Sequence, residues 1–176
     1  MRSCLMLVLI LFSCPITSMG NSIDMSIGFA EKTRHISVDG IQTAENTVGI
    51  PVEYNGRSLD SIVQVKYNFN SNWAITSDYT LSRVYYEQHR RGTIGEDWGL
   101  GIQYSPIQKV GFNVSTLFSF NDQVGKSLGL RLSGEANITK DFSLISQFEV
   151  SKIKTIQSAG ILAKHQNYGF GFRYKV

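Results

Sequence analysis

The chain has 176 residues, enough for one domain, and 17 basic against 14 acidic residues give a formal net charge of +3. A charge this small, without a basic stripe interleaved with aromatic residues, excludes nucleic acid as the expected partner. Hydrophobic residues make up 42% and charged residues 18%, so the chain is neither disordered nor a bundle of membrane helices. Sixteen glycines, ten Phe, eight Tyr, two Trp and only three prolines favour sheet over helix.

The N-terminal segment has the features of an export signal. Arg2 supplies a positive charge, residues 5–12 are apolar without interruption, and small or polar residues follow from Ser13. The apolar run is too short to cross a bilayer as a helix. We therefore predict a signal peptide over residues 1–20.

Cleavage after Gly20 would leave a mature domain, residues 21–176, that contains no cysteine, because Cys4 and Cys14 both precede it. That would exclude a disulfide framework and thiolate chemistry. An alternative remains open at the same segment. Leu11-Phe12-Ser13-Cys14 resembles a lipobox, which would place a lipid on Cys14.

From residue 22 onward the sequence alternates with a period of two in eight segments. In each segment one set of alternate residues is apolar and the other is polar or glycine. In the fourth, Trp98, Leu100 and Ile102 alternate with Gly99 and Gly101. The pattern predicts eight strands, at about 22–32, 59–69, 73–86, 96–105, 109–120, 127–138, 142–154 and 165–176.

The connections between these segments alternate in length. Tight turns are predicted at 70–72, 105–108 and 139–141. Longer polar stretches lie at 33–58, 87–95, 121–126 and 155–164, and the first is expected to be a mobile surface loop. This alternation is typical of an outer-membrane barrel with periplasmic turns and extracellular loops. We therefore predict an all-β fold, an eight-stranded antiparallel transmembrane up-and-down β-barrel in the bacterial cell outer membrane.

A soluble sandwich also alternates, so the glycines decide which face is inside. Glycine on an exposed strand packs nothing and costs backbone entropy, whereas a narrow eight-stranded lumen has little room for side chains. The glycine-rich polar face is therefore expected to line the lumen and the apolar face to meet lipid. Aromatic residues gather near the strand ends, as two interfacial girdles would.

The predicted lumen face carries charges of both signs, which should pair because an unpaired buried charge is costly. We predict a plug of ion pairs and hydrogen bonds with Arg131, Glu135 and Glu149 at its centre; a gated ion pathway is the alternative. The predicted lumen network consists of Asp24, Lys66, Asp78, Asp97, Arg131, Glu135, Glu149, Arg173 and Lys175.

Neither a metal nor a cofactor is expected. His35, His89 and His165 fall at loop edges or strand ends and lack the spacing of metal ligands. A Ser–His–acid set that includes Ser77 and Asp78 is conceivable, but the two are expected on opposite faces of the wall. We therefore expect no catalysis.

Basic residues near the loop side of the barrel are candidates for contact with lipopolysaccharide phosphates or acidic host glycans. A solvated rim is the alternative, since Glu87 and Glu96 lie nearby in the sequence. The candidates are Arg90, Arg91, Lys152, Lys154 and Lys164.

In pattern, over nearly the whole mature chain, the sequence resembles the OmpA/OmpX-like family of small outer-membrane barrels. The closing Tyr168-x-Phe170-x-Phe172-x-Tyr174-x-Val176 resembles the C-terminal strand that the barrel-assembly machinery recognises, although that signal usually ends in Phe or Trp. The resemblance implies a surface protein that displays loops to a host ligand for adhesion or colonisation, as accessory colonisation factors do. The alternatives are a structural membrane protein, a small channel with no dedicated ligand, and a lipid-modifying barrel enzyme.

Overall fold

The computed structural model describes residues 21–42, 47–48, 52–86, 93–121, 125–154 and 160–176. Within these ranges no helix has the length and hydropathy needed to cross a membrane. The strands are β1 (Ser22–Gln42), β2 (Thr47–Val48), β3 (Val52–Asn68), β4 (Trp73–Tyr86), β5 (Thr93–Ile107), β6 (Val110–Asn121), β7 (Gly125–Asn137), β8 (Phe142–Lys154) and β9 (Gly160–Lys175).

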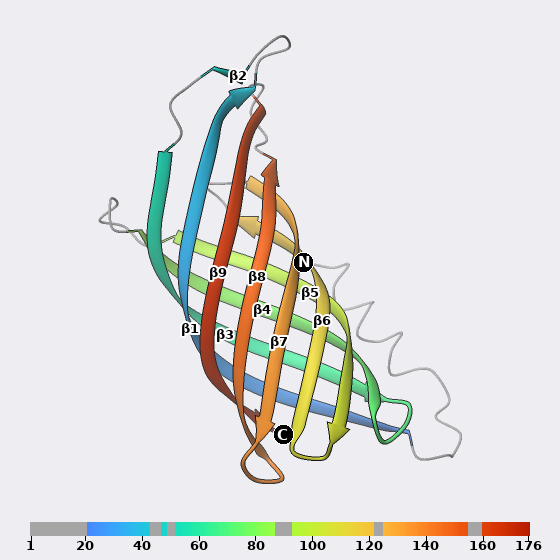
Figure 1. Ribbon diagram of the computed structural model, residues 1–176. Helices are drawn as coiled ribbons and strands as arrows, with labels where there is room; N and C mark the ends of the chain where they lie inside the picture. Colours follow the sequence, from blue (N-terminus) through green and yellow to red (C-terminus); the bar gives the residue numbers. More distant parts are fainter. Residues whose placement is uncertain (1–20, 43–46, 49–51, 87–92, 122–124, 155–159) are drawn as a thin grey trace, which may run out of the picture.

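Eight of these strands close into a barrel, as predicted (Figure 1). From β3 to β9 each strand pairs antiparallel with the next along the chain, and β1 pairs with both β3 and β9. The β1–β9 pairing runs from Ser26↔Lys175 to Gln42↔Gly160 and completes the ring of hydrogen bonds. The two residues of β2 pair only with Ile41 and Gln42 at the end of β1.

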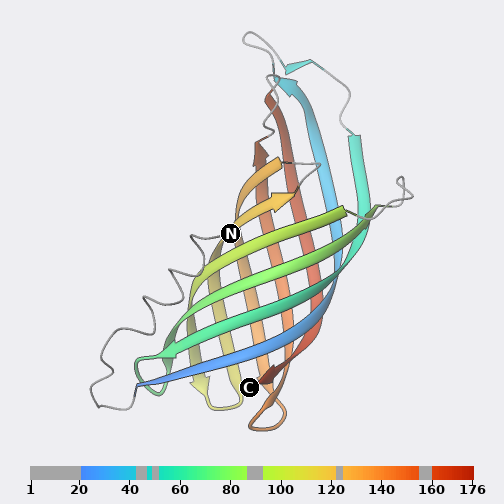
Figure 2. The ribbon, with the colours of Figure 1, turned by 180° about the vertical axis from the view of Figure 1, so that it is seen from behind.

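The connections from β3 to β4, from β5 to β6 and from β7 to β8 lie at one end of the barrel, which we call the turn end, and the opposite end is the loop end (Figures 1 and 2). Side chains fix two of the turns. Asn70 accepts hydrogen bonds from the backbone N–H groups of Asn72 (2.9 Å) and Trp73 (2.8 Å). Thr139 accepts one from the N–H of Phe142 at 3.0 Å.

The prediction of a long loop over 33–58 is wrong. β1 continues to Gln42 and β3 begins at Val52, so most of this stretch is paired strand. Thr33 and Arg57 face outward and are exposed, but they are polar. The outer face is therefore no longer apolar here, and the alternation of apolar and polar residues disappears. The period of two in hydrophobicity marks only the part of a strand that faces lipid, whereas the backbone pairing of β1 and β3 continues past that part.

The barrel is apolar outside and polar inside. Leu100 and Phe118 are 58% and 57% exposed on the outer wall, while the neighbouring Gly99 and Gly101 are buried in the lumen. On β6 the outward apolar positions run from Val110 to Phe120, which at about 3.3 Å per residue and a tilt of about 40° makes a belt about 25 Å high. Such a surface is suited to the hydrocarbon core of a membrane.

Aromatic pairs mark the two edges of this belt, as expected of interfacial anchors. Near the turn end, the rings of Trp73 and Tyr104 lie 4.7 Å apart. Toward the loop end, Tyr79 and Trp98 lie 4.6 Å apart, and Phe148 and Tyr168 lie 4.9 Å apart.

The seam between β1 and β9 depends on a residue without a side chain. A Cβ at Gly171 would collide with the Phe29 carbonyl oxygen and with the backbone of Ala30 on β1. Because these are backbone atoms, no rotamer change could relieve the contact. Closure of the barrel therefore requires glycine at this position.

Gly171→Ala is expected to cost about 2–3 kcal/mol of stability and to reduce the fraction of chains that close. Urea unfolding and the shift between folded and boiled mobility in a detergent gel measure the two effects. Gly134→Ala is the matched control, because a Cβ there would meet only the Ser146 hydroxyl, at 3.1 Å. Equal losses in both variants would contradict this account of the seam.

Candidate functional site: the polar core of the barrel

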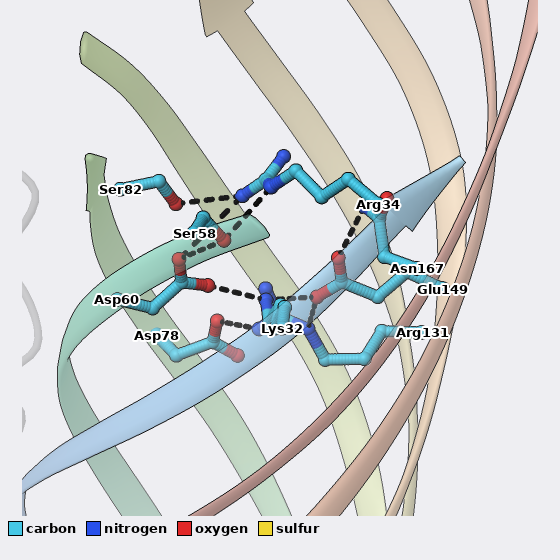
Figure 3. Close-up of polar contacts among 9 residues, drawn as sticks. All are labelled: Lys32, Arg34, Ser58, Asp60, Asp78, Ser82, Arg131, Glu149 and Asn167. Atoms are coloured by element: carbon cyan, nitrogen blue, oxygen red, sulfur yellow. Dashed lines mark hydrogen bonds and ion pairs between the residues drawn. The ribbon is translucent and has the colours of Figure 1, made fainter. Parts of the chain in front are cut away.

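Six charged side chains meet inside the barrel, and we call them the polar core (Figure 3). All are less than one-tenth exposed, and Lys32 is 0% exposed. They come from five different strands. The members are Lys32 and Arg34 of β1, Asp60 of β3, Asp78 of β4, Arg131 of β7 and Glu149 of β8.

Lys32 connects three strands through two carboxylates. Its Nζ lies 2.7 Å from Asp60 Oδ2 and 2.6 Å from Glu149 Oε1. Both carboxylates are as fully buried as the lysine. The amine is therefore held by two opposite charges in place of water, which is the condition for burying it.

Arg131 joins opposite walls of the barrel. Its Nε donates to Glu149 Oε1 at 2.6 Å, and Glu149 is its direct partner on the neighbouring strand. Its Nη1 donates to Asp78 Oδ2, and β4 does not pair with β7. Asn167 of β9 donates to the remaining Glu149 oxygen at 3.0 Å. The contacts of Arg131 and Glu149 thus span the lumen.

Arg34 forms the layer nearest the loop end. Its Nε donates to Ser58 Oγ at 2.8 Å, and its Nη2 donates to Ser82 Oγ at 2.9 Å. Ser58 in turn donates to Asp60 Oδ1 at 2.7 Å. These bonds tie the Arg34 layer to the carboxylate that also holds Lys32.

Lumen glycines leave the space that the polar core fills. A Cβ at Gly99 would occupy the position of the Asp78 carboxylate, and one at Gly169 would meet the side chain of Lys32. The glycines that indicate the inner face in the sequence are therefore also the reason that long charged side chains fit there.

The polar core is balanced in charge. Three cations face three carboxylates, so the group as a whole is neutral. Its ion pairs fill the middle of the lumen, and this arrangement is suited to closing the barrel and joining its walls. Among the described residues, no group of three or more His, Cys, Asp or Glu side chains is placed to hold a metal ion.

The structure places three of the predicted lumen residues, Asp78, Arg131 and Glu149, in the polar core. Asp97 is also buried, within electrostatic reach of Arg131. The other five predicted residues lie nearer the turn end. They are Asp24, Lys66, Glu135, Arg173 and Lys175.

The expectation that Glu135 belongs to the centre is wrong. It lies 3.3 Å from Arg173 Nη1, in the layer nearer the turn end. Glu135 lies four residues along β7 from Arg131, a distance of about 13 Å. The two share a face of the barrel wall, but they lie at different depths.

Sequence reasoning missed Lys32, Arg34 and Asp60. The signal was present, because the inward positions of β1 continue from Gly28 and Ala30 to Lys32 and Arg34 at the same spacing. Assigning 33–58 to a loop removed Arg34 from consideration, whereas Lys32 and Asp60 lie at the ends of the predicted strands 22–32 and 59–69 and were overlooked there.

Of the predicted anion contacts at the loop end, Arg90 and Arg91 lie outside the described residues, and so does His89. Lys152 and Lys164 are exposed and lie directly opposite each other on β8 and β9. Lys126 of β7 is exposed too, and its backbone pairs with that of Lys154, whose side chain is outside the described set.

The remaining histidines lie on β1 and β9 near the loop end. His35 Nδ1 lies 2.8 Å from Asn55 Oδ1 on the outer surface. His165 lies opposite Ser151 of β8 and Ile36 of β1, and its Nε2 is buried. The two are therefore on opposite sides of the barrel wall.

No protein-family profile matches the chain, and no curated protein sequence matches it. Solved structures do match, and three of them are small outer-membrane barrels. Neisserial surface protein A is 13% identical with a TM-score of 0.53, over 90% of this chain and 100% of that one. Ail, the attachment invasion locus protein of Yersinia pestis, is 16% identical with a TM-score of 0.51, over 90% and 100%. The outer membrane protein OprG from Pseudomonas aeruginosa is 11% identical with a TM-score of 0.52, over 89% and 97%. These likenesses show the fold, that of a small outer-membrane barrel.

Arg131→Met is expected to lower the free energy of unfolding by about 3–5 kcal/mol, because it leaves the Asp78 carboxylate buried without its cation. Arg57→Met is the matched control. Arg57 lies 4.0 Å from Glu31 on the outer surface, where the two side chains are 77% and 63% exposed, and its loss should cost less than about 1 kcal/mol. Urea unfolding in lipid vesicles, followed by tryptophan fluorescence, measures both. Similar losses would show that the polar core does not stabilise the barrel.

Proposed function

We propose that the chain is an outer-membrane surface protein of the OmpA/OmpX-like type, with its loop end outside the cell and its turn end in the periplasm. The apolar belt, the closed barrel and the export signal in the sequence support this location. A neutral polar core in the lumen favours a role at the barrel's ends over conduction through it. The proposed activity is binding of a surface partner for adhesion or colonisation.

The observation that carries this proposal is a sheet that continues above the belt. β1 and β9 rise furthest at the loop end, and β3 pairs with β1 as far as Val38↔Val52 (Figures 1 and 2). Tyr168 of the loop-side girdle lies opposite Thr33, and β1 extends from there to Gln42. The nine residues from Arg34 to Gln42 add about 30 Å of strand, which a barrel that only crosses the membrane does not need.

The projecting sheet offers polar side chains and an open edge. Glu53, Asn55 and Gln166 are exposed on its outer face. Residues 52–55 of β3 pair with β1, while pairing with β4 begins only at Gly56, so no described strand covers this part of the edge. An uncovered edge can accept an extended peptide as an added strand. A partner that presents such a segment fits this surface.

The exposed lysines next to the loop-side girdle support the proposed orientation. Lys126 of β7 lies opposite Phe120 of β6, and Lys152 of β8 lies opposite Lys164 of the neighbouring β9. Exposed ammonium groups at this level are suited to contact with lipid phosphate groups. Lipopolysaccharide in the outer leaflet is the proposed lipid partner.

One of the structural relatives is named as an attachment and invasion protein. The two chains are 16% identical, so that protein's name is consistent with the proposed activity but does not carry it. The projecting sheet of this chain remains the reason for the proposal.

Replacing residues 38–52 by an Asn-Gly turn should remove the part of the projecting sheet beyond Ser37 and Glu53 and leave the barrel intact. Ser37 and Glu53 are register partners, and a two-residue Asn-Gly turn closes such a pair. Bacteria that display this variant should adhere to epithelial cells at least about tenfold less than those with the unaltered chain, a loss of about 1.4 kcal/mol in binding.

The matched control replaces 122–124 by the same turn between the partners Asn121 and Gly125. It should adhere normally, and both variants should keep heat-modifiable mobility. Undiminished adhesion by a folded variant without the projecting sheet would rule out the proposed activity.

A further inference from the structure

We propose that the turn end of the lumen contains a binding site for a phosphate group. A cavity of about 140 Å³ lies there, far larger than the roughly 15 Å³ that a single water needs. Its charged lining consists of Asp24, Lys66, Glu135, Lys140, Arg173 and Lys175. This proposal does not depend on the adhesion role, because it concerns the opposite end of the barrel.

The cavity carries more positive charge than its own carboxylates neutralise. Asp24 accepts from Lys175 at 2.6 Å and from Asn68 at 2.9 Å, so both of its oxygens are engaged. Lys66 is the cross-strand neighbour of Asp24 but makes no direct ion pair with another described residue. The balance of four cations against two carboxylates leaves a net charge of +2.

Glu135 is engaged at one oxygen. Its Oε2 accepts from Arg173 at 3.3 Å and from Gln103 at 3.4 Å. Within the described residues no ion pair joins either carboxylate to Lys140, an exposed turn residue at the mouth of the cavity. Two lysines thus face the cavity in excess of the acids.

Arg173 provides an observation independent of this charge count. The residue is only 6% exposed and lines the cavity. Its Nε has no hydrogen-bond partner among the described residues. A buried guanidinium donor without a partner is costly, and an oxyanion in the cavity would satisfy it.

These features together specify the ligand by its chemistry. The excess positive charge suits a phosphate group, which carries one negative charge in a lipid phosphodiester and up to two in the free ion near pH 7, and lysine and arginine donors are the usual partners of phosphate. The neutral lining adds the hydroxyls of Ser26 and Ser143 and the amide of Gln64. Two sources can present such a group at this end: free phosphate, or the headgroup of a lipid in the adjoining leaflet.

The test titrates the refolded barrel in alkyl maltoside micelles, which carry no phosphate, with inorganic phosphate at low ionic strength. The unaltered chain should bind saturably. Lys66→Gln/Lys140→Gln should weaken binding at least about tenfold, whereas Lys66→Arg/Lys140→Arg should retain it. Lys109→Gln/Arg57→Gln is the control, because it removes two exposed cations that do not line the cavity. It should bind as the unaltered chain does.

A parallel titration with a soluble short-chain phosphatidylglycerol separates the two sources. Tighter binding of the lipid assigns the site to a headgroup, and tighter binding of inorganic phosphate assigns it to the free ion. Amide NMR shifts in the unaltered chain give a readout that does not depend on a variant folding. Shifts should move at Gln64, Lys66 and Ser143. Absence of saturable binding of either ligand, shifts confined to the loop end, or equal losses in the glutamine and control pairs would overturn the proposal.

Discussion

A guanidinium removed from water must be held by carboxylates, and Arg131 meets this requirement with Glu149 beside it and Asp78 on the opposite wall. Lys32 shares the same Glu149 oxygen and adds Asp60. Each of these charges is tolerated only because the others are present. The strands that carry them are therefore fixed relative to one another across the lumen as well as along their hydrogen-bonded edges.

The lumen and the outer wall make opposite demands on the sequence, and alternating residues meet both. Outward positions are apolar because they face hydrocarbon, and inward positions are polar or glycine because the lumen is narrow. With the middle of the lumen filled, the surfaces that can meet a partner lie at the two ends. The loop end offers a projecting sheet with an open edge, and the turn end offers a cavity with excess positive charge.

Much of the barrel follows from the sequence because lipid contact imposes a period of two. The inner face could be predicted because Gly99 and Gly101 alternate with large apolar residues. The extent of β1 and β3 could not, since above the belt the outward positions are polar and the inward positions include both Arg34 and Ile36, so the alternation seen within the belt is lost. The same limit concealed Arg34, whereas Lys32 and Asp60 lie at the ends of strands that the sequence did predict.

The ion-pair partners that face each other across the lumen could not be predicted from the sequence either. Spacing along a strand gives the face that a residue occupies, but not which residue of the opposite wall lies at its depth. Glu135 shares a face with Arg131 and yet pairs with Arg173. The contact between Arg131 and Asp78 depends on how the sheet closes, and no local pattern encodes that.

The polar core is expected to close the lumen to ions. Planar-bilayer recording of the refolded chain tests this claim directly. A closed lumen predicts insertions without discrete conductance steps across a range of voltages. Uniform, reproducible steps with every insertion would show an open path through Lys32, Arg131 and Glu149, and would contradict the account.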